Sequence, residues 1–164
     1  MTRQQTFKEF ILLHSFFEDF INRHADFHRQ LEAAIDGLPQ EGLDWVPGDD
    51  MNSLCVLVVH VVGAERFWCG TVAFDDPAPR DRDAEFRVRG LSLADLKDAL
   101  THSRTYVHNG LARLTLDDLT QVRDVRGRDR QVRVGWALLH VLDHIALHVG
   151  HAQITRQLWD QRNR

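Results

Sequence analysis

The sequence predicts an all-α protein, a four-helix bundle formed by one domain over residues 1–164. Three observations support this fold class. Four long stretches place apolar side chains at alternating spacings of three and four residues, the period of an amphipathic helix. The connections between them contain the proline, glycine and aspartate residues that favour turns. The 164-residue chain is 43% hydrophobic and 27% charged, an ordinary balance for a globular domain.

The first helix is expected from about Gln5 to Asp36. Gly37 is expected to end it, because glycine readily adopts the left-handed conformation that follows many helices. The residues of its apolar face are Phe10, Leu13, Phe17, Phe20, His24, Phe27, Leu31 and Ala34. Its first half carries more apolar side chains than one face buries, which predicts a homodimer. These side chains are Phe7, Phe10, Ile11, Leu12, Phe16, Phe17, Phe20 and Ile21.

The second helix follows a connection over residues 38–50 and is expected to begin at Asn52 or Ser53, whose side chains suit the first position of a helix. Its apolar face consists of Leu54, Leu57, Val61, Ala64 and Trp68. The β-branched residues of the segment 58–62 leave a strand as the alternative, although the length and spacing favour a helix. The helix is expected to end at Gly70 or within residues 75–79.

A polar connection from Asp75 to Gly90 leads to the third helix, and its length suits a crossover between helices of a bundle. Ser92 is expected to begin the third helix, with Asp95 completing a capping box. The fourth helix is expected from about Val134 to Gln161.

An arginine-rich segment over residues 121–133 separates the third and fourth helices and is expected to form a loop or a short hairpin turning at Gly127. Its arginines alternate with Asp124 and Asp129, and no aromatic side chain lies among them. The whole chain carries a formal charge of −4. These features argue against nucleic acid as a partner, because nucleic-acid readers carry a basic, often aromatic surface.

The fourth helix carries several of the chain's ten histidines. His140, His144 and His148 follow one another at intervals of four residues, and His151 follows three residues later. Residues four apart share one face of a helix, so two such imidazoles can bind the same ion. Apolar neighbours place this face toward the core, where neutral imidazoles need polar partners and a shared metal ion supplies one.

His60, near the middle of the second helix, is the natural third ligand. The competing interpretation is a lone core histidine that hydrogen bonds to a carbonyl or a water molecule. His24 and His28 repeat the four-residue spacing on the first helix. For them a buried histidine with a polar partner is the favoured interpretation, and a position beside the metal is the alternative.

The sequence at this point resembles the DinB/YfiT-like family of metalloenzymes, over about Leu31 to Leu158. The resemblance lies in SLCVLVVHVVGAERFW at residues 53–68 and LLHVLDHIALHVGHAQITRQL at residues 138–158. The family motif is one histidine in the second helix followed by H-x3-H-x-G in the fourth. Its positions here are His60, His144, His148 and Gly150.

The resemblance implies a bundle in up-down-down-up order, a frequent dimer, and a divalent ion, zinc or nickel, on the three motif histidines. Three protein ligands leave one position open, as in catalytic zinc sites. Neighbouring groups are expected to orient the ligand rings by hydrogen bonding. The candidates for this role are Glu65, His140, Asp143, His151 and His24.

Some members of the family transfer small thiols such as bacillithiol or mycothiol, or use them in isomerisation. The resemblance therefore implies a metal-dependent enzyme that transfers a low-molecular-weight thiol to an electrophile. A metal-dependent hydrolase and a non-catalytic, stress-associated metal-binding bundle remain the alternatives.

Other classes of protein are disfavoured. The sequence contains no P-loop, no dinucleotide-binding glycine motif and no nucleophile elbow. Neither a signal peptide nor a membrane span is expected, because the longest apolar run, over residues 51–64, is short of the roughly 20 residues that cross a bilayer. Cys55 and Cys69 would lie about 21 Å apart along one helix, too far to form a disulfide. A cytoplasmic protein with reduced thiols is expected.

Overall fold

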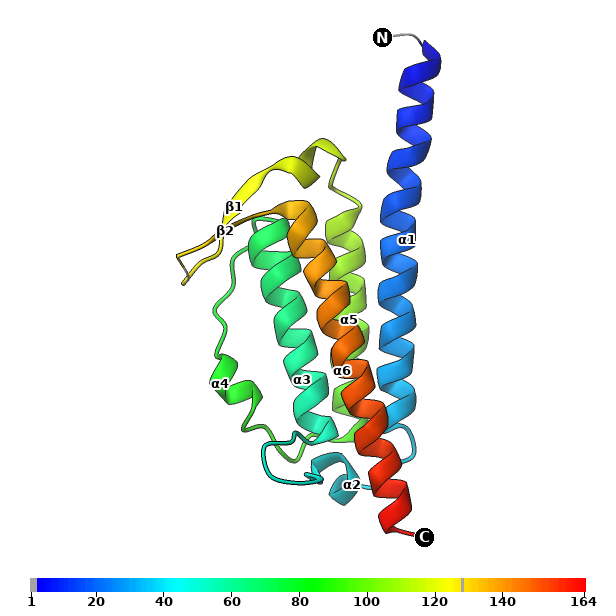
Figure 1. Ribbon diagram of the computed structural model, residues 1–164, viewed down its shortest axis with the longest axis vertical. Helices are drawn as coiled ribbons and strands as arrows, with labels where there is room; N and C mark the ends of the chain where they lie inside the picture. The colour runs from blue at the N-terminus through cyan, green and yellow to red at the C-terminus, as the bar shows by residue number, and fades with distance from the viewer. Residues whose placement is uncertain (1–2, 128) are drawn as a thin grey trace.

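The computed structural model describes residues 3–127 and 129–164, with side chains described from residue 15 onward. The protein is mostly helical, with one small two-stranded sheet, so the all-α prediction is confirmed (Figure 1). The elements in chain order are α1 (Arg3–Ile35), α2 (Gln40–Asp44), α3 (Leu54–Glu65), the π-helical segment η1 (Arg66–Ala73), α4 (Arg82–Glu85), α5 (Leu93–Leu111), the 3₁₀ turn η2 (Asp117–Thr120), β1 (Val122–Asp124), β2 (Gln131–Arg133) and α6 (Val134–Arg162).

The long helices lie side by side. Helix α1 packs against α5 and α6, and α3 packs against the same two helices. Figure 1 shows that α1 and α6 run in one direction and that α3 and α5 run in the other. The first turns of α1 project beyond the ends of the other helices (Figure 1). The centre of the molecule is therefore enclosed by α1, α3, α5 and α6.

Local signals explain where the helices begin and end. The Ser53 hydroxyl accepts a hydrogen bond from the backbone N–H of Val56 at the start of α3. Ser92 and Asp95 form the expected capping box at the start of α5. Gly37 has a φ of +69° just after α1, a conformation that glycine adopts without steric cost. The strand alternative for residues 58–62 was wrong, since this segment lies inside α3.

Several connections contain more structure than the sequence patterns indicate. The second helix passes Gly70 and continues to Ala73 as a π-helix. Short helices, α2 and α4, lie in the connections that were expected to be irregular. The arginine-rich segment forms the hairpin alternative, with β1 and β2 antiparallel and Gly127 at a φ of +75°.

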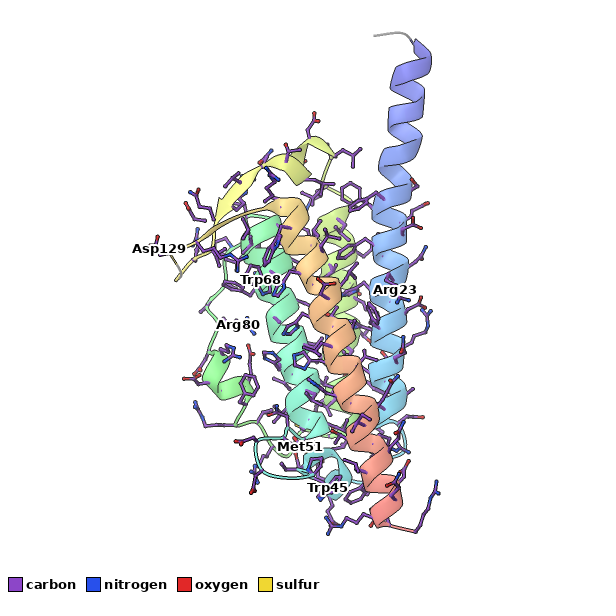
Figure 2. All side chains as sticks on the ribbon, in the orientation of Figure 1. Arg23, Trp45, Met51, Trp68, Arg80 and Asp129 are labelled. Atoms are coloured by element: carbon purple, nitrogen blue, oxygen red, sulfur yellow. The ribbon has the colours of Figure 1, made fainter. Side chains whose placement is uncertain are left out.

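The core follows the expected apolar faces. From residue 15 onward, the predicted face of α1 is buried from Phe17 to Ala34, whereas Phe10 and Leu13 lie outside the described side chains. Trp45 packs against Trp159 at the end of the bundle where α6 finishes (Figure 2). Cys55 and Cys69 are both buried, free thiols.

One helical stretch of the described chain, Leu54–Ala73, has the length and apolarity of a membrane span. The sequence analysis expected no run of this length, and the continuation of α3 into η1 produces it. In the structure 72% of its most apolar window is buried by the rest of the protein. This burial is what the central helix of a soluble bundle shows.

Candidate metal centre

Three imidazole rings from two helices converge between α3 and α6, on the side of the bundle where α4 contacts His60. His60 lies on α3, and His144 and His148 lie one turn apart on α6. The Nε2 atom of His144 is 3.1 Å from Nε2 of His60 and 3.2 Å from Nε2 of His148. The structure therefore brings together the three histidines that the sequence pattern selected, and it aims the same ring nitrogen of each toward one point.

The donor set of this cluster fits a divalent cation. Two nitrogens bound to one tetrahedral zinc ion, each about 2.0–2.1 Å from it, are separated by about 3.3 Å. The observed separations of 3.1 and 3.2 Å are close to that value. Hydrogen bonds among the three rings do not satisfy all three Nε2 atoms. Each neutral ring carries one N–H proton, and that of His60 lies on Nδ1, where Glu85 accepts it. A cation at the centre would accept all three lone pairs.

Glu85 on α4 fixes the orientation of His60. Its Oε2 atom lies 2.9 Å from Nδ1 of His60, so the proton of the neutral ring is held on Nδ1 and the lone pair on Nε2 faces His144. Arg80 in turn donates two hydrogen bonds to the same carboxylate, of 2.6 Å to Oε1 and 2.8 Å to Oε2. Figure 2 shows Arg80 on the segment that precedes α4. The sequence analysis did not identify Glu85, which is 25 residues from His60.

Two residues near His60 support its contact with Glu85: Gly63 leaves space for the carboxylate, and Phe86 covers the imidazole ring. A methyl group at Gly63, one turn after His60, would overlap the Glu85 carboxylate. Glycine at this position therefore lets α4 approach α3 closely. The ring of Phe86 lies 4.6 Å from the ring of His60, measured between centroids, and shields it on the α4 side.

Burial keeps the three rings neutral. It lowers the pKa of His144 to about 3 and the pKa of His148 to about 4, and the other histidines of the cluster add to both shifts. Burial also lowers the pKa of His60, although hydrogen bonding to Glu85 opposes the shift. Neutral imidazole is the form that binds metal ions, so the protein holds these side chains ready for a cation.

The other histidines of α6 flank the cluster. Nδ1 of His151 lies 3.4 Å from Nδ1 of His148, in the position expected of a group that orients a ligand ring. His140 instead stacks on Trp136, with a centroid distance of 4.9 Å, and contacts the edge of the buried Trp68. Asp143 is exposed on α6, one residue and about 100° around the helix from His144.

Glu65 does not lie where the sequence analysis placed it. Five residues on a helix correspond to a rotation of about 140°, so Glu65 faces away from the side of α3 that carries His60. Its carboxylate contacts His24, His28 and Ser103 instead. His24 belongs to that second cluster too: it is buried, as the favoured interpretation expected, and its Nε2 atom lies 3.2 Å from the Glu65 carboxylate.

A cavity of about 210 Å³ opens beside the metal centre. His151 forms part of its wall together with Leu57, which precedes His60 by three residues on α3. The remaining lining residues are Asp50, Met51, Asn52, Ile154 and Thr155. Figure 2 shows Met51 at this end of α3. The cavity offers a mostly apolar space within one helical turn of two of the three imidazole ligands.

The helical fold and the three clustered imidazoles are those of a DinB-like protein, and the comparison with known families supports this class. The sequence matches the family model described as mycothiol-S-transferase over residues 17–161. The chain therefore belongs to the mycothiol-S-transferase family. The matched region contains all three histidines of the candidate metal centre.

Solved structures show the same fold at low sequence identity. A conserved protein from Enterococcus faecalis superposes with a TM-score of 0.72 at 17% identity, covering 86% of this chain and 95% of that one. A DinB-like protein from Bacillus cereus gives 0.68 at 19%, covering 85% and 90%. A variant of a mycothiol-dependent maleylpyruvate isomerase gives 0.63 at 12%, covering 81% of this chain and 59% of that one. None of the curated proteins compared matches the sequence.

Proposed function

We propose that this protein is a metal-dependent enzyme that transfers mycothiol, or a thiol of similar kind, to an electrophile. His60, His144 and His148 would hold one divalent ion, zinc or nickel, through their Nε2 atoms. The observation that carries the proposal is the convergence of three neutral imidazoles in a chain of the mycothiol-S-transferase family. We also infer that the long helices form the up-down-down-up bundle expected from the sequence.

The ligand set determines what such a centre can do. Three neutral ligands add no negative charge, so the bound ion would supply its full positive charge to favour the thiolate form of a nearby thiol. In the transfer itself the thiol gives its proton to solvent or a base and its sulfur bonds to the electrophilic carbon. At the same time either the bond from that carbon to its leaving group breaks, and the group departs with the electron pair, or a double bond of the electrophile takes up the pair and is then protonated by solvent. The chain's own cysteines do not suit the role of nucleophile, because both are buried and burial raises the pKa of both thiols.

The chain's residues have separate tasks in this proposal. Glu85 and Arg80 hold His60 in the orientation that points Nε2 at the centre. Phe86 covers His60 on the α4 side, and the adjacent cavity offers a mostly apolar space for a substrate. His151 stands between that cavity and His148, where a substrate entering the cavity would meet it.

The test is a transfer assay with a panel of thiols. Metal-loaded protein is offered mycothiol, bacillithiol, glutathione or coenzyme A, each with a chromogenic electrophile, and compared with His148→Ala. His102→Ala, which removes an exposed histidine of α5, is the matched control. Thiol-dependent turnover in the wild type and control that is lost in His148→Ala supports the proposal. Equal rates in all three proteins for every thiol would overturn it and favour a hydrolase or a non-catalytic metal-binding protein.

A further inference from the structure

A second cluster of metal-ligating side chains lies in the core, apart from the three histidines described above. It consists of His24 and His28, one turn apart on α1, and Glu65 at the end of α3. Their relative exposures are 3%, 0% and 1%. Oε1 of Glu65 lies 2.7 Å from Nε2 of His28 and 3.2 Å from Nε2 of His24. Two ring nitrogens and one carboxylate oxygen therefore meet at a point shielded from solvent.

Hydrogen bonding within the protein leaves this cluster incomplete. Nε2 of His24 has no hydrogen-bond partner despite its distance of 3.2 Å from Glu65, and Nδ1 of His28 has none either. A buried polar atom without a partner destabilises the folded protein, because it has lost its hydrogen bonds to water. The other carboxylate oxygen of Glu65 is taken by the hydroxyl of Ser103 on α5. The ring nitrogen of His24 that lacks a hydrogen bond therefore lies 3.2 Å from an oxygen that already contacts His28.

A cavity borders this cluster at His24. Its volume is about 260 Å³, it lies between α1 and α5, and His24 forms part of its wall. The other residues that line it are Ile21, Ala25, Arg104, Thr105, Val107 and His108. The cavity therefore approaches the cluster from a side that contains no residue of the first metal centre.

We propose that His24, His28 and Glu65 form a second divalent-cation site. Two imidazoles and a carboxylate are a ligand set that zinc accepts. The N···O distance of 3.2 Å at His24 already matches ligands of one zinc ion, and the pair formed by His28 and Glu65 needs to open by about half an ångström. The ion would join α1 to α3 beside Ser103 of α5, so it would hold the first helix against the bundle.

Metal counting on variants tests this proposal independently of any activity. The double variant His144→Ala/His148→Ala removes two ligands of the first centre and leaves the second cluster intact. After removal of all metal and reloading with zinc, we expect two ions per chain in the wild type and one in the double variant. Adding Glu65→Gln to the double variant should remove the remaining ion, whereas adding His102→Ala should not.

Each outcome decides between the two sites. A double variant that binds no zinc overturns the second site and leaves the proposed enzyme function standing. If the triple variant, with Glu65→Gln added to the double variant, still binds one ion, that ion lies outside the second cluster and the proposal is also overturned. If the variant with Glu65→Gln fails to fold, His28→Gln in the same double variant replaces it. As a second measurement, a chelator should lower the melting temperature of the zinc-loaded double variant.

Discussion

The Oε2 atom of Glu85 lies 2.9 Å from Nδ1 of His60, the ring nitrogen on the opposite side from the Nε2 atom of the metal centre. A carboxylate in this position fixes the ring and raises its basicity toward a metal ion. We predict that Glu85→Gln weakens zinc binding at the first centre by about 10- to 100-fold, the usual effect of losing such a partner. Competition with a chromogenic chelator measures it. Glu41→Gln, at an exposed position of α2, is the control, and an unchanged affinity in Glu85→Gln would contradict the role given to this carboxylate.

A pair of glycine substitutions tests the close approach of α4 to α3. Gly63→Ala places a methyl group on the Glu85 carboxylate and should displace it, so zinc affinity falls as in Glu85→Gln. Gly150→Ala meets no atom within 4 Å and lies in α6, so it should stabilise the protein by about 0.5–1 kcal/mol and leave zinc binding unchanged. Thermal unfolding and chelator competition on both variants provide the readouts. Similar effects of the two substitutions would show that the packing of Gly63 is unimportant.

The sequence predicts much of this fold because its helix boundaries depend on local chemistry. Ser53, Ser92 and Gly37 act within one turn of the helix ends that they determine. The spacing of His144 and His148 likewise follows from helical geometry alone. Each of these features can be recognised without knowing what packs against it.

The remaining features depend on tertiary contacts. Glu85 reaches His60 from a connection whose composition indicates only a polar segment. The π-helical continuation through Gly70 has no periodic signal, and tight packing of this segment accompanies it: a side chain at Gly70 would overlap Arg66 and Tyr106. Glu65 follows His60 by only five residues, but five residues turn a helix by about 140°, so Glu65 contacts His24 and His28 and not the first metal centre.

The response to pH follows from the depressed pKa values of the ligands. The sequence alone predicts that zinc binding weakens as pH falls through about 6.5, the ordinary pKa of imidazole. In the folded protein the pKa is about 3 for His144 and about 4 for His148, and burial also lowers the pKa of His60, so protons should compete with zinc at a lower pH than for free imidazole. We therefore predict a zinc affinity that is nearly constant from pH 6.5 to 5, measured by competition at each pH. A steep loss of affinity over that range would show that the rings titrate normally.

The same pKa shifts should make the stability of the metal-free protein depend on pH. In the unfolded chain these histidines take up protons below about pH 6.5, whereas in the folded protein they stay neutral until about pH 4 to 3. The unfolded state thus binds more protons within that window, so acidification lowers the free energy of unfolding progressively across it. Denaturant unfolding from pH 7 to 4 should show a shallower decline for His144→Ala/His148→Ala than for the wild type. Parallel curves would contradict the shifts.

The mass of the protein in solution tests whether it forms the dimer expected from the apolar surface of α1. The side chains of Phe7, Phe10, Ile11 and Leu12 lie outside the described residues. Beside that region, Leu139 of α6 is 56% exposed and lines a cavity with Phe16 and Phe20. We predict light scattering at micromolar concentration to give twice the chain mass of 19.0 kDa. Leu139→Asp should weaken the dimer, while Val122→Asp on β1 should not, and a mass of 19.0 kDa for the wild type would contradict the prediction.

The ionisation of a thiol bound to the protein is the sharpest test of the proposed thiol transfer, because it needs no electrophile. A free thiol has a pKa of about 8.5, so it is mostly protonated at pH 7. Mycothiol is added to metal-loaded protein, and its ultraviolet thiolate absorbance is followed from pH 5 to 9, with His148→Ala and His102→Ala in parallel. The account predicts thiolate absorbance below pH 7 in the wild type and in His102→Ala, and the curve of free mycothiol in His148→Ala. A wild-type curve identical to that of free mycothiol would contradict it.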